Sequence, residues 1–306
     1  MPHLSIEDCK RDPARALRVL LRYLPLSLCV REIMRLRALS ERGELETPLL
    51  DVGCGDGLFW EAAGETARTD GERLRGLMGI DVNPHELRIA SLRLGREGGA
   101  VRRVDISGPH GTMDDIASAT YPTILANCSL EHVRQIDRAF RNLHGLQRES
   151  GLFHLFVPAP DWTDTLRLKR LLSGMHPRLG MLYGAMWDGF FQHHHLYPHY
   201  VWRHLLESSG YHVETLQGIG SFHANRLFAR WAAPSFPAFL YKELFKRYPT
   251  WYAPLKRGYV RWMEQGFLEE IRAGACIQSD PEHPETVEYY IVCRKKSGNG
   301  HHPEKP

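Results

Sequence analysis

The chain has 306 residues, which is long enough for one large domain with elaborations. Hydrophobic residues make up 43% and charged residues 25% of the sequence, and this ordinary balance excludes a chain that is disordered throughout. The formal net charge of +3 at pH 7 is too small to indicate nucleic-acid binding by itself.

The six cysteines are scattered, with no C-x-x-C pair and no close Cys/His spacing. This pattern argues against a zinc site and against a disulfide framework, so we expect reduced thiols and a cytoplasmic location. Arg18, Arg22, Pro25 and Arg31 interrupt the N-terminal apolar stretch. The sequence therefore predicts neither secretion nor a membrane-spanning segment.

The first part of the chain, residues 1–46, is predicted to be a helical cap. Apolar residues recur at helical spacing over residues 14–40, in two pieces divided at Pro25, and arginines occupy the other face. The two helices either pack on a following domain and cover its ligand crevice, which we favour, or present a face to a membrane surface.

Three glycines at alternate positions, Gly53, Gly55 and Gly57, directly follow a short apolar run. This order predicts a strand, a tight turn and a helix whose free N–H groups face a ligand in the turn. Hydride-transferring enzymes use G-x-G-x-x-G, whereas here the third glycine comes one residue early and Leu58 takes the last place. Asp56 would repel a pyrophosphate but is compatible with S-adenosylmethionine, which has no phosphate and carries a sulfonium cation. We therefore predict S-adenosylmethionine as the ligand, against the alternative of a glycine-rich turn without one.

Further apolar runs at 77–81, 101–106, 121–127 and 151–158 alternate with helical stretches. This alternation predicts βαβ units and a parallel sheet that binds its ligand at the carboxyl ends of the strands. Asp81 ends the second run, where an acidic side chain accepts hydrogen bonds from ribose hydroxyls. It also suits the cap of the helix that begins near Pro84, although Asn83 is the better cap.

The segment D-x-G-x-G-x-G at 51–57 resembles the first motif of class I S-adenosylmethionine-dependent methyltransferases. T-I-L-A-N-C-S-L-E-H-V at 123–133 is similar to the fourth-strand motif of the group that includes quinone-biosynthesis and sterol enzymes. The resemblance covers residues 49 to about 216 and a last strand at 287–294. It implies an α/β fold with a doubly wound, mostly parallel seven-stranded sheet, an antiparallel last strand, and S-adenosyl-L-methionine as the cofactor.

The same resemblance places the fourth-strand motif beside the transferable methyl group. It also implies that Asp105 accepts a hydrogen bond from the adenine amino group, although an exposed loop aspartate fits the sequence nearly as well. The cofactor-binding residues predicted on all these grounds are Asp51, Gly53, Cys54, Gly55, Gly57, Asp81, Val82, Asp105, Ile106, Asn127 and Cys128.

The predicted core, 47–220, contains a long segment at 159–197 where the alternation stops, which we interpret as a lid or a substrate-shaping insertion. An insertion at 221–285, rich in aromatic and basic residues, precedes the last strand at 286–295 and a disordered tail at 296–306. Its apolar spacing predicts two amphipathic helices. Over 221–275 it either lines a large apolar acceptor pocket or contacts an anionic membrane surface.

Histidines supply the candidates for a catalytic base, which would help if the acceptor is a hydroxyl or a protonated amine. His193 and His195 are preferred, with His132 and Asp161 as further candidates, and all of them could instead only form hydrogen bonds. His193 and His195 alternate as two metal ligands on a strand would, but the sequence has no carboxylate or cysteine near them. We therefore predict no metal site.

The sequence as a whole predicts methyl transfer to a small or lipid-like hydrophobic acceptor, in secondary or lipid metabolism. Alignment and exclusion of water would supply most of the rate enhancement. Rival interpretations are a nicotinamide-dependent oxidoreductase and a non-catalytic adaptor with the same fold. A nucleic-acid substrate is not expected, because Asn127 is followed by Cys128 and Ser129 and not by an N-P-P-Y signature. Peripheral contact with the inner face of a membrane is an open alternative to a purely cytoplasmic location.

Overall fold

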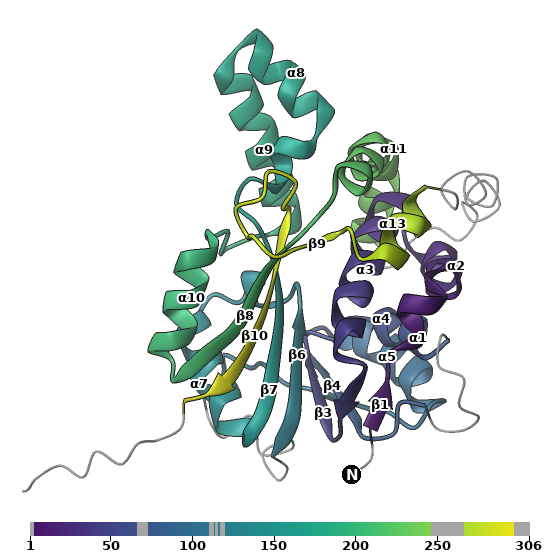
Figure 1. Cartoon of the computed structure of the whole chain (residues 1–306), viewed down its shortest axis with the longest axis vertical. Helices are drawn as coiled ribbons and strands as arrows, with labels where there is room; N and C mark the ends of the chain where they lie inside the picture. Colours follow the sequence, from purple (N-terminus) through teal and green to yellow (C-terminus); the bar gives the residue numbers. More distant parts are fainter. Residues whose placement is uncertain are drawn as a thin grey trace, which may run out of the picture.

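A computed structural model describes residues 3–65, 73–109, 113, 116, 120–245 and 266–296. Its centre is an eight-stranded sheet with the strand order β5-β4-β3-β6-β7-β10-β8-β9 (Figure 1). The strands are β3 (Leu49–Val52), β4 (Leu77–Asp81), β5 (Ala100–Arg103), β6 (Tyr121–Asn127), β7 (Gln147–Pro158), β8 (Tyr211–Ile219), β9 (Ile277–Gln278) and β10 (Glu288–Lys295). Strands β3 to β7 run parallel, and β10 is antiparallel to both of its neighbours. The predicted fold class is confirmed, with one strand more than the predicted seven because the short β9 extends the edge beside β8.

Helices cover both faces of this sheet. The helices α4 (Leu58–Gly64) and α5 (Pro84–Gly95) lie on one side, and α7 (Ile136–Leu146) and α10 (His199–Ser208) on the other (Figure 1). Side chains of β3 alternate between the two resulting cores, because Leu49 belongs to one buried cluster and Leu50 to the other. A parallel strand buried on both faces explains the continuous apolar runs of the sequence.

The N-terminal helices are α1 (Asp8–Arg11), α2 (Pro13–Tyr23) and α3 (Leu26–Leu39), and the predicted division at Pro25 is confirmed. The segment 1–46, predicted to be helical, also contains two short strands, because β2 (Glu44–Glu46) pairs antiparallel with β1 (His3–Ser5). Short 3₁₀ turns are η1 (Ser40–Arg42), η3 (Leu130–His132) and η4 (Trp162–Thr165).

The arginine face of α3 is buried, which the helical pattern did not predict. Arg35 donates two hydrogen bonds to Glu288 of β10, at 2.8 and 2.7 Å, and the Arg31 guanidinium lies over the Phe228 ring at 4.3 Å. The face is covered because the helix α11 (Phe222–Phe245) packs against α3. Charged residues buried in this way are retained because they are paired.

The segment after β7 forms a helical hairpin, α8 (Arg167–Met175) and α9 (Pro177–Phe191), which projects beyond the end of the sheet (Figure 1). An aromatic cluster holds its base, where Trp187 of α9 contacts Phe236 and Phe239 of α11 with ring centroids 5.9 and 6.2 Å apart. None of the described helices is long and apolar enough to cross a membrane.

The insertion before β10 contains α11 and the short α13 (Phe267–Ala273). Leu240 and Leu244, on which the first amphipathic helix was predicted, lie on α11 and are exposed. The predicted second helix lies mostly outside the described residues, with Leu255, Tyr259 and Met263, as do Tyr248 and the tail from residue 297.

Candidate active site

The carboxyl ends of the parallel strands open into a cavity of about 1000 Å³. This volume lies at the upper end of the range for ligand sites. Its walls come from the glycine turn after β3, the loops after β4, β5 and β6, and the helices α2 and α3. Most of the predicted cofactor-binding residues lie in these walls, namely Gly53, Cys54, Gly55, Asp81, Val82, Asp105, Ile106, Asn127 and Cys128.

Two of the glycines serve different purposes. Gly53 has a φ of +74°, and a Cβ atom there would lie 2.3 Å from the Cβ of Ser129, so this position packs the turn against the loop after β6. Gly55 has a φ of +54°, lines the cavity, and a Cβ atom there would have no neighbour within 4 Å. The absence of a side chain at Gly55 therefore allows a ligand in the cavity to approach the backbone closely, and no protein group needs this space.

Asp81 joins the glycine turn to the end of β4. Its carboxylate accepts hydrogen bonds from the backbone N–H groups of Gly55 at 3.0 Å and Asn83 at 2.8 Å. A carboxylate has about four lone-pair positions, so two remain for ligand hydroxyls. The expected cap is also present, since Asn83 accepts from the N–H of His85 at 3.0 Å. These free acceptor positions fit the ribose of a nucleoside.

The far end of the cavity has an apolar surface and a second carboxylate. Val82 is 57% exposed although it is aliphatic. Asp105 lies two residues beyond the end of β5, is exposed, and accepts from the N–H and the hydroxyl of Ser107 at 2.9 and 2.7 Å. An apolar contact beside a hydrogen-bond acceptor suits an adenine ring, so the residues present fit the predicted cofactor.

Asp51 and Gly57 lie behind the wall and do not line the cavity. Asp51 is buried, and its Oδ2 accepts a hydrogen bond from Trp60 Nε1 at 2.7 Å. Burial raises the pKa of Asp51 to about 7, the Trp60 hydrogen bond opposes this shift, and the charges of Asp81 and Glu32 reinforce it. Asp51 therefore lies under the glycine turn, where it supports the cavity wall. A direct contact between Asp51 and the cofactor stays a prediction.

Glu32 of α3 is a cavity residue that the sequence did not identify. Its carboxylate accepts hydrogen bonds from Asn127 Nδ2 at 3.3 Å and Arg35 Nη1 at 3.0 Å. Burial raises its pKa, while Arg35 and the Asn127 hydrogen bond lower it. The signal in the sequence was a single acidic residue on the arginine face of this helix. A carboxylate here can hold the ammonium group of a ligand.

The three predicted histidines occupy different environments. His132 lines the cavity and stacks on His193, with ring centroids 5.4 Å apart, but His193 itself is not part of the wall. Both ring nitrogens of His195 contact other groups, Nδ1 with the Tyr197 hydroxyl at 3.0 Å and Nε2 with the Val133 carbonyl at 2.7 Å. His195 therefore has a structural position, and a catalytic role for His132 or His193 stays a prediction.

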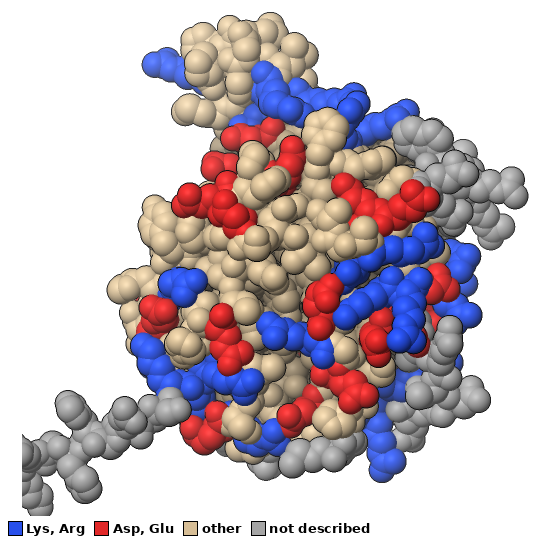
Figure 2. Space-filling view, in the orientation of Figure 1, with Lys and Arg blue, Asp and Glu red and all other residues tan. Residues whose placement is uncertain are grey.

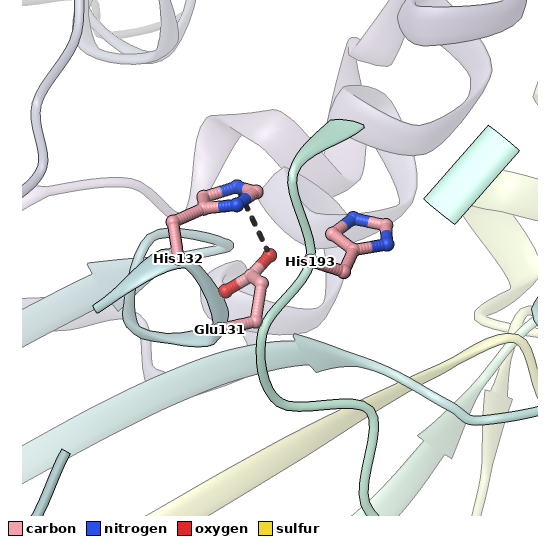
Figure 3. Close-up of side chains that lie close together, drawn as sticks. All are labelled: Glu131, His132 and His193. Carbon is pink, nitrogen blue, oxygen red and sulfur yellow. Dashed lines mark ion pairs between the residues drawn. The ribbon is translucent and has the colours of Figure 1, made fainter. Parts of the chain in front are cut away.

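A carboxylate lies beside these rings, contrary to what the local sequence indicated. Figure 3 shows the Glu131 carboxylate between the rings of His132 and His193, and Glu131 Oε1 lies 3.8 Å from His132 Nε2. Burial raises the pKa of Glu131, and the nearby histidines oppose that shift. The segment 159–197 contributes no residue to the cavity wall, and its role as a lid or a substrate-shaping insertion stays a prediction.

The insertion at 221–275 is predicted either to line an acceptor pocket or to contact a membrane surface. Among the described residues of 221–275, only Lys242 reaches the cavity, where it pairs with Glu86 at 3.4 Å. Phe236 and Phe239 of α11 instead pack against α9, and Phe228 packs against η4. These aromatics therefore do not line this cavity, and both interpretations of the insertion stay predictions.

The family model described as a methyltransferase domain matches residues 20–216. No curated protein sequence matches the chain. Among solved structures, the [4+2]-cyclase SpnF superimposes with a TM-score of 0.50 at 16% identity, over 87% of this chain and 82% of that chain. The trans-methyltransferase CalH in complex with SAH gives 0.47 at 15% identity, over 87% of this chain and 56% of that chain. A putative methyltransferase from Bacillus halodurans C-125 gives a TM-score of 0.43 at 13% identity, over 81% of this chain and 92% of that chain. At these identities the structural likeness shows the fold alone, and SpnF is described as a cyclase.

Proposed function

The chain belongs to the methyltransferase domain family and is an S-adenosylmethionine-dependent methyltransferase, and we propose that its acceptor is a small or lipid-like hydrophobic compound of secondary or lipid metabolism. Family membership argues against a nicotinamide-dependent oxidoreductase. The open cavity argues against the second rival, a non-catalytic adaptor with the same fold, for which a filled or collapsed cofactor crevice is expected. The cofactor, when bound, supplies a methyl group on a sulfonium sulfur.

The observation that carries the proposal is the apolar wall formed by the N-terminal helices. Leu20 and Tyr23 of α2, Leu28 of α3 and Leu24 between the two helices line the same cavity as the glycine turn. Burying an apolar acceptor against such side chains contributes about 25 cal/mol per Å² of area removed from water. The wall therefore favours hydrophobic acceptors over charged ones.

The residues of the chain mainly bind and orient. Asp81 holds ribose hydroxyls, and Glu32 holds the ammonium group of the methionine part. The apolar wall excludes water. Alignment of the methyl donor and the acceptor in such a site can lower the activation barrier by about 7–11 kcal/mol. His132 lines the cavity, and its side chain is 40% exposed. Its ring can therefore accept a proton from a hydroxyl group of the methyl acceptor.

Methyl transfer is tested by incubating the purified protein with S-adenosylmethionine and a total lipid and small-molecule extract, followed by mass spectrometry for compounds that gain one methyl group. We expect a methylated product that is apolar and that forms more slowly with the Asp81→Ala variant when S-adenosylmethionine is below saturation. A methylated product that is charged and insoluble in organic solvent would overturn the acceptor class. Calorimetry with S-adenosylhomocysteine and with NADH distinguishes a methyltransferase from an oxidoreductase. Heat of binding from NADH alone would favour the oxidoreductase.

Membrane-surface contact, expected over 221–275, forms part of this proposal because a lipid-like acceptor resides in a bilayer. Leu240, Leu244 and Phe245 of α11 are exposed, which supports it. The α8–α9 hairpin supports it further, since Leu171, Met175 and other apolar side chains of both helices are exposed and α8 buries no residue.

The charge of the hairpin matches an anionic surface. Arg167, Arg170 and Arg178 are exposed, and residues 167–187 contain no Asp or Glu. In Figure 2 the projecting lobe shows uncharged atoms at its end and Lys or Arg along its flanks. Exposed apolar side chains that alternate with cations are typical of segments that lie in the interface of a membrane.

Flotation with vesicles of neutral lipid, with and without a fraction of anionic lipid, tests this contact. We expect binding to anionic vesicles that weakens with salt and is lost when Leu171, Met175 and Leu182 are all changed to Ser. Leu92→Ser is the matched control, because Leu92 is equally exposed at 63% but lies on α5. Equal flotation of the triple variant and the control would contradict a role for the hairpin in membrane contact. Light scattering that shows a dimer formed through the hairpin would also contradict it.

A further inference from the structure

The cluster of Glu131, His132 and His193 consists of three hydrogen-bond acceptors that face one another (Figure 3). One ligand atom from each side chain, a carboxylate oxygen or a ring nitrogen, lies within 4.8 Å of the other two. Glu131 and His132 belong to η3 after β6, and His193 follows α9, so the fold brings together groups that are distant in the sequence.

The tautomers of both histidines follow from their outer contacts. His132 Nδ1 lies 3.2 Å from the carbonyl oxygen of Gln192, and His193 Nδ1 lies 3.4 Å from Asp188 Oδ1. A carbonyl and a carboxylate only accept hydrogen bonds, so in each neutral ring Nδ1 carries the hydrogen and Nε2 carries the lone pair. The two Nε2 atoms are therefore acceptors beside a carboxylate.

Glu131 leaves an oxygen without a partner in the same place. Its side chain is 1% exposed, and its Oε2 has no hydrogen-bond partner among the described residues. Two imidazole lone pairs and a buried carboxylate repel one another unless a cation lies between them. This arrangement of acceptors with outer hydrogen bonds on Nδ1 is the one found around metal ions held by histidine and carboxylate.

We propose that Glu131, His132 and His193 bind a divalent first-row transition metal ion through one carboxylate oxygen and the two Nε2 atoms. Imidazole nitrogens with one carboxylate suit zinc, iron, nickel or copper and leave positions open for further ligands. With metal–ligand bonds of about 2.0–2.2 Å, tetrahedral ligand atoms lie roughly 3.3 Å apart. The three atoms lie within 4.8 Å of one another, so each pair needs to close by about 1.5 Å at most. Rotation of the two rings about their side-chain torsions provides this movement, since the Asp188 contact is long.

Asp188 is then a positioning residue and not a ligand. It accepts from Trp162 Nε1 at 3.0 Å as well as from His193, which fixes its carboxylate against the His193 ring. His132 lines the cavity, so the metal ion would lie at the cavity wall. A metal ion on Nε2 takes the lone pair that would otherwise accept a proton, so in the metal-bound protein His132 is a ligand and not a base. The proposal does not depend on the identity of the methyl acceptor, and methyl transfer by a protein without metal would leave the proposed function standing.

Metal binding is tested on the full chain, stripped with a chelator and then titrated with Zn²⁺ in competition with a coloured chelator. We expect about one tightly held Zn²⁺ per chain, and a loss of affinity of roughly 100-fold or more in Glu131→Gln and in His193→Gln. His194→Gln is the matched control, because His194 is the exposed neighbour of His193 and is not part of the cluster. Asp188→Asn should lose about 10- to 100-fold, as expected for an outer hydrogen-bond partner.

Two further measurements keep the test decisive. Affinity for S-adenosylhomocysteine reports whether each variant is folded, and the visible absorption of Co²⁺ in the wild-type protein reports nitrogen ligation directly. If Zn²⁺ affinity is the same in wild type, Glu131→Gln and His193→Gln, or if Co²⁺ shows only its aqueous spectrum, the proposal is overturned. The cluster is then an ion pair that holds a proton.

Discussion

The cavity wall at the strand ends and the projecting α8–α9 hairpin differ in what holds them in place. In the wall, Gly53 packs against Ser129 and Asp81 binds the backbone of the turn, so each position is fixed by close neighbours. On the hairpin, side chains such as Leu171 and Met175 are exposed, and only the base is held by aromatic contacts of Trp187. Substitutions in the wall should therefore change stability and cofactor affinity, whereas those on the hairpin should change only surface contacts.

The largest effect is expected for Gly53→Ala. A Cβ atom at a φ of +74° and 2.3 Å from the Cβ of Ser129 adds backbone strain and a steric clash, so the free energy of unfolding should fall by about 2–5 kcal/mol. Urea unfolding measures the difference. Gly55→Ala is the control, with strain alone costing about 1–2 kcal/mol and with weaker binding of S-adenosylhomocysteine. Equal stability losses in the two variants would contradict the packing role of Gly53.

Asp51→Asn should change how stability depends on pH. The pKa of Asp51 in the folded protein is about 7, against 3.8 for a free side chain, so the native state holds the proton more tightly. The stability from this group is present below about pH 4 and is lost as pH rises to about 7, with about 2–3 kcal/mol lost between pH 5 and pH 8. The Asp51→Asn variant lacks this loss. Between pH 5 and pH 8 its free energy of unfolding should therefore fall by about 2–3 kcal/mol less than that of the wild type. Parallel pH profiles of the two proteins would show that the carboxyl is already ionised at pH 5.

Asp81→Ala should weaken cofactor binding by about 1.5–3 kcal/mol, the usual cost of hydrogen bonds to a charged group. Calorimetry with S-adenosylhomocysteine measures the change. Asp137→Ala, an exposed aspartate on α7 outside the cavity wall, is the control and should leave the affinity unchanged. Unchanged affinity in Asp81→Ala would show that the ribose is held elsewhere.

The smallest effect is expected for the hairpin. Leu171→Ser, Met175→Ser and Leu182→Ser should each change the free energy of unfolding by less than about 0.5 kcal/mol, because exposed positions away from packing contacts tolerate substitution. Thermal unfolding of the three single variants measures this. A loss of 2 kcal/mol or more, about the cost of truncating a buried apolar side chain, would mean that the face packs against part of the chain or a second copy, and would remove the contrast with the wall.

The amino-acid sequence alone determined the order of strands and helices, the glycine turn and the acidic residue after the second core strand. These features depend on local spacing, because alternate glycines and apolar runs constrain the backbone within a few residues of themselves. Only the tertiary structure decided which polar groups meet. It buried Arg35 against Glu288, brought Glu32 to the cavity, and placed Glu131 between His132 and His193. Arg35 with Glu288 and Glu131 with His193 are far apart in the chain, and their geometry follows from how whole helices pack on the sheet, which no local pattern contains.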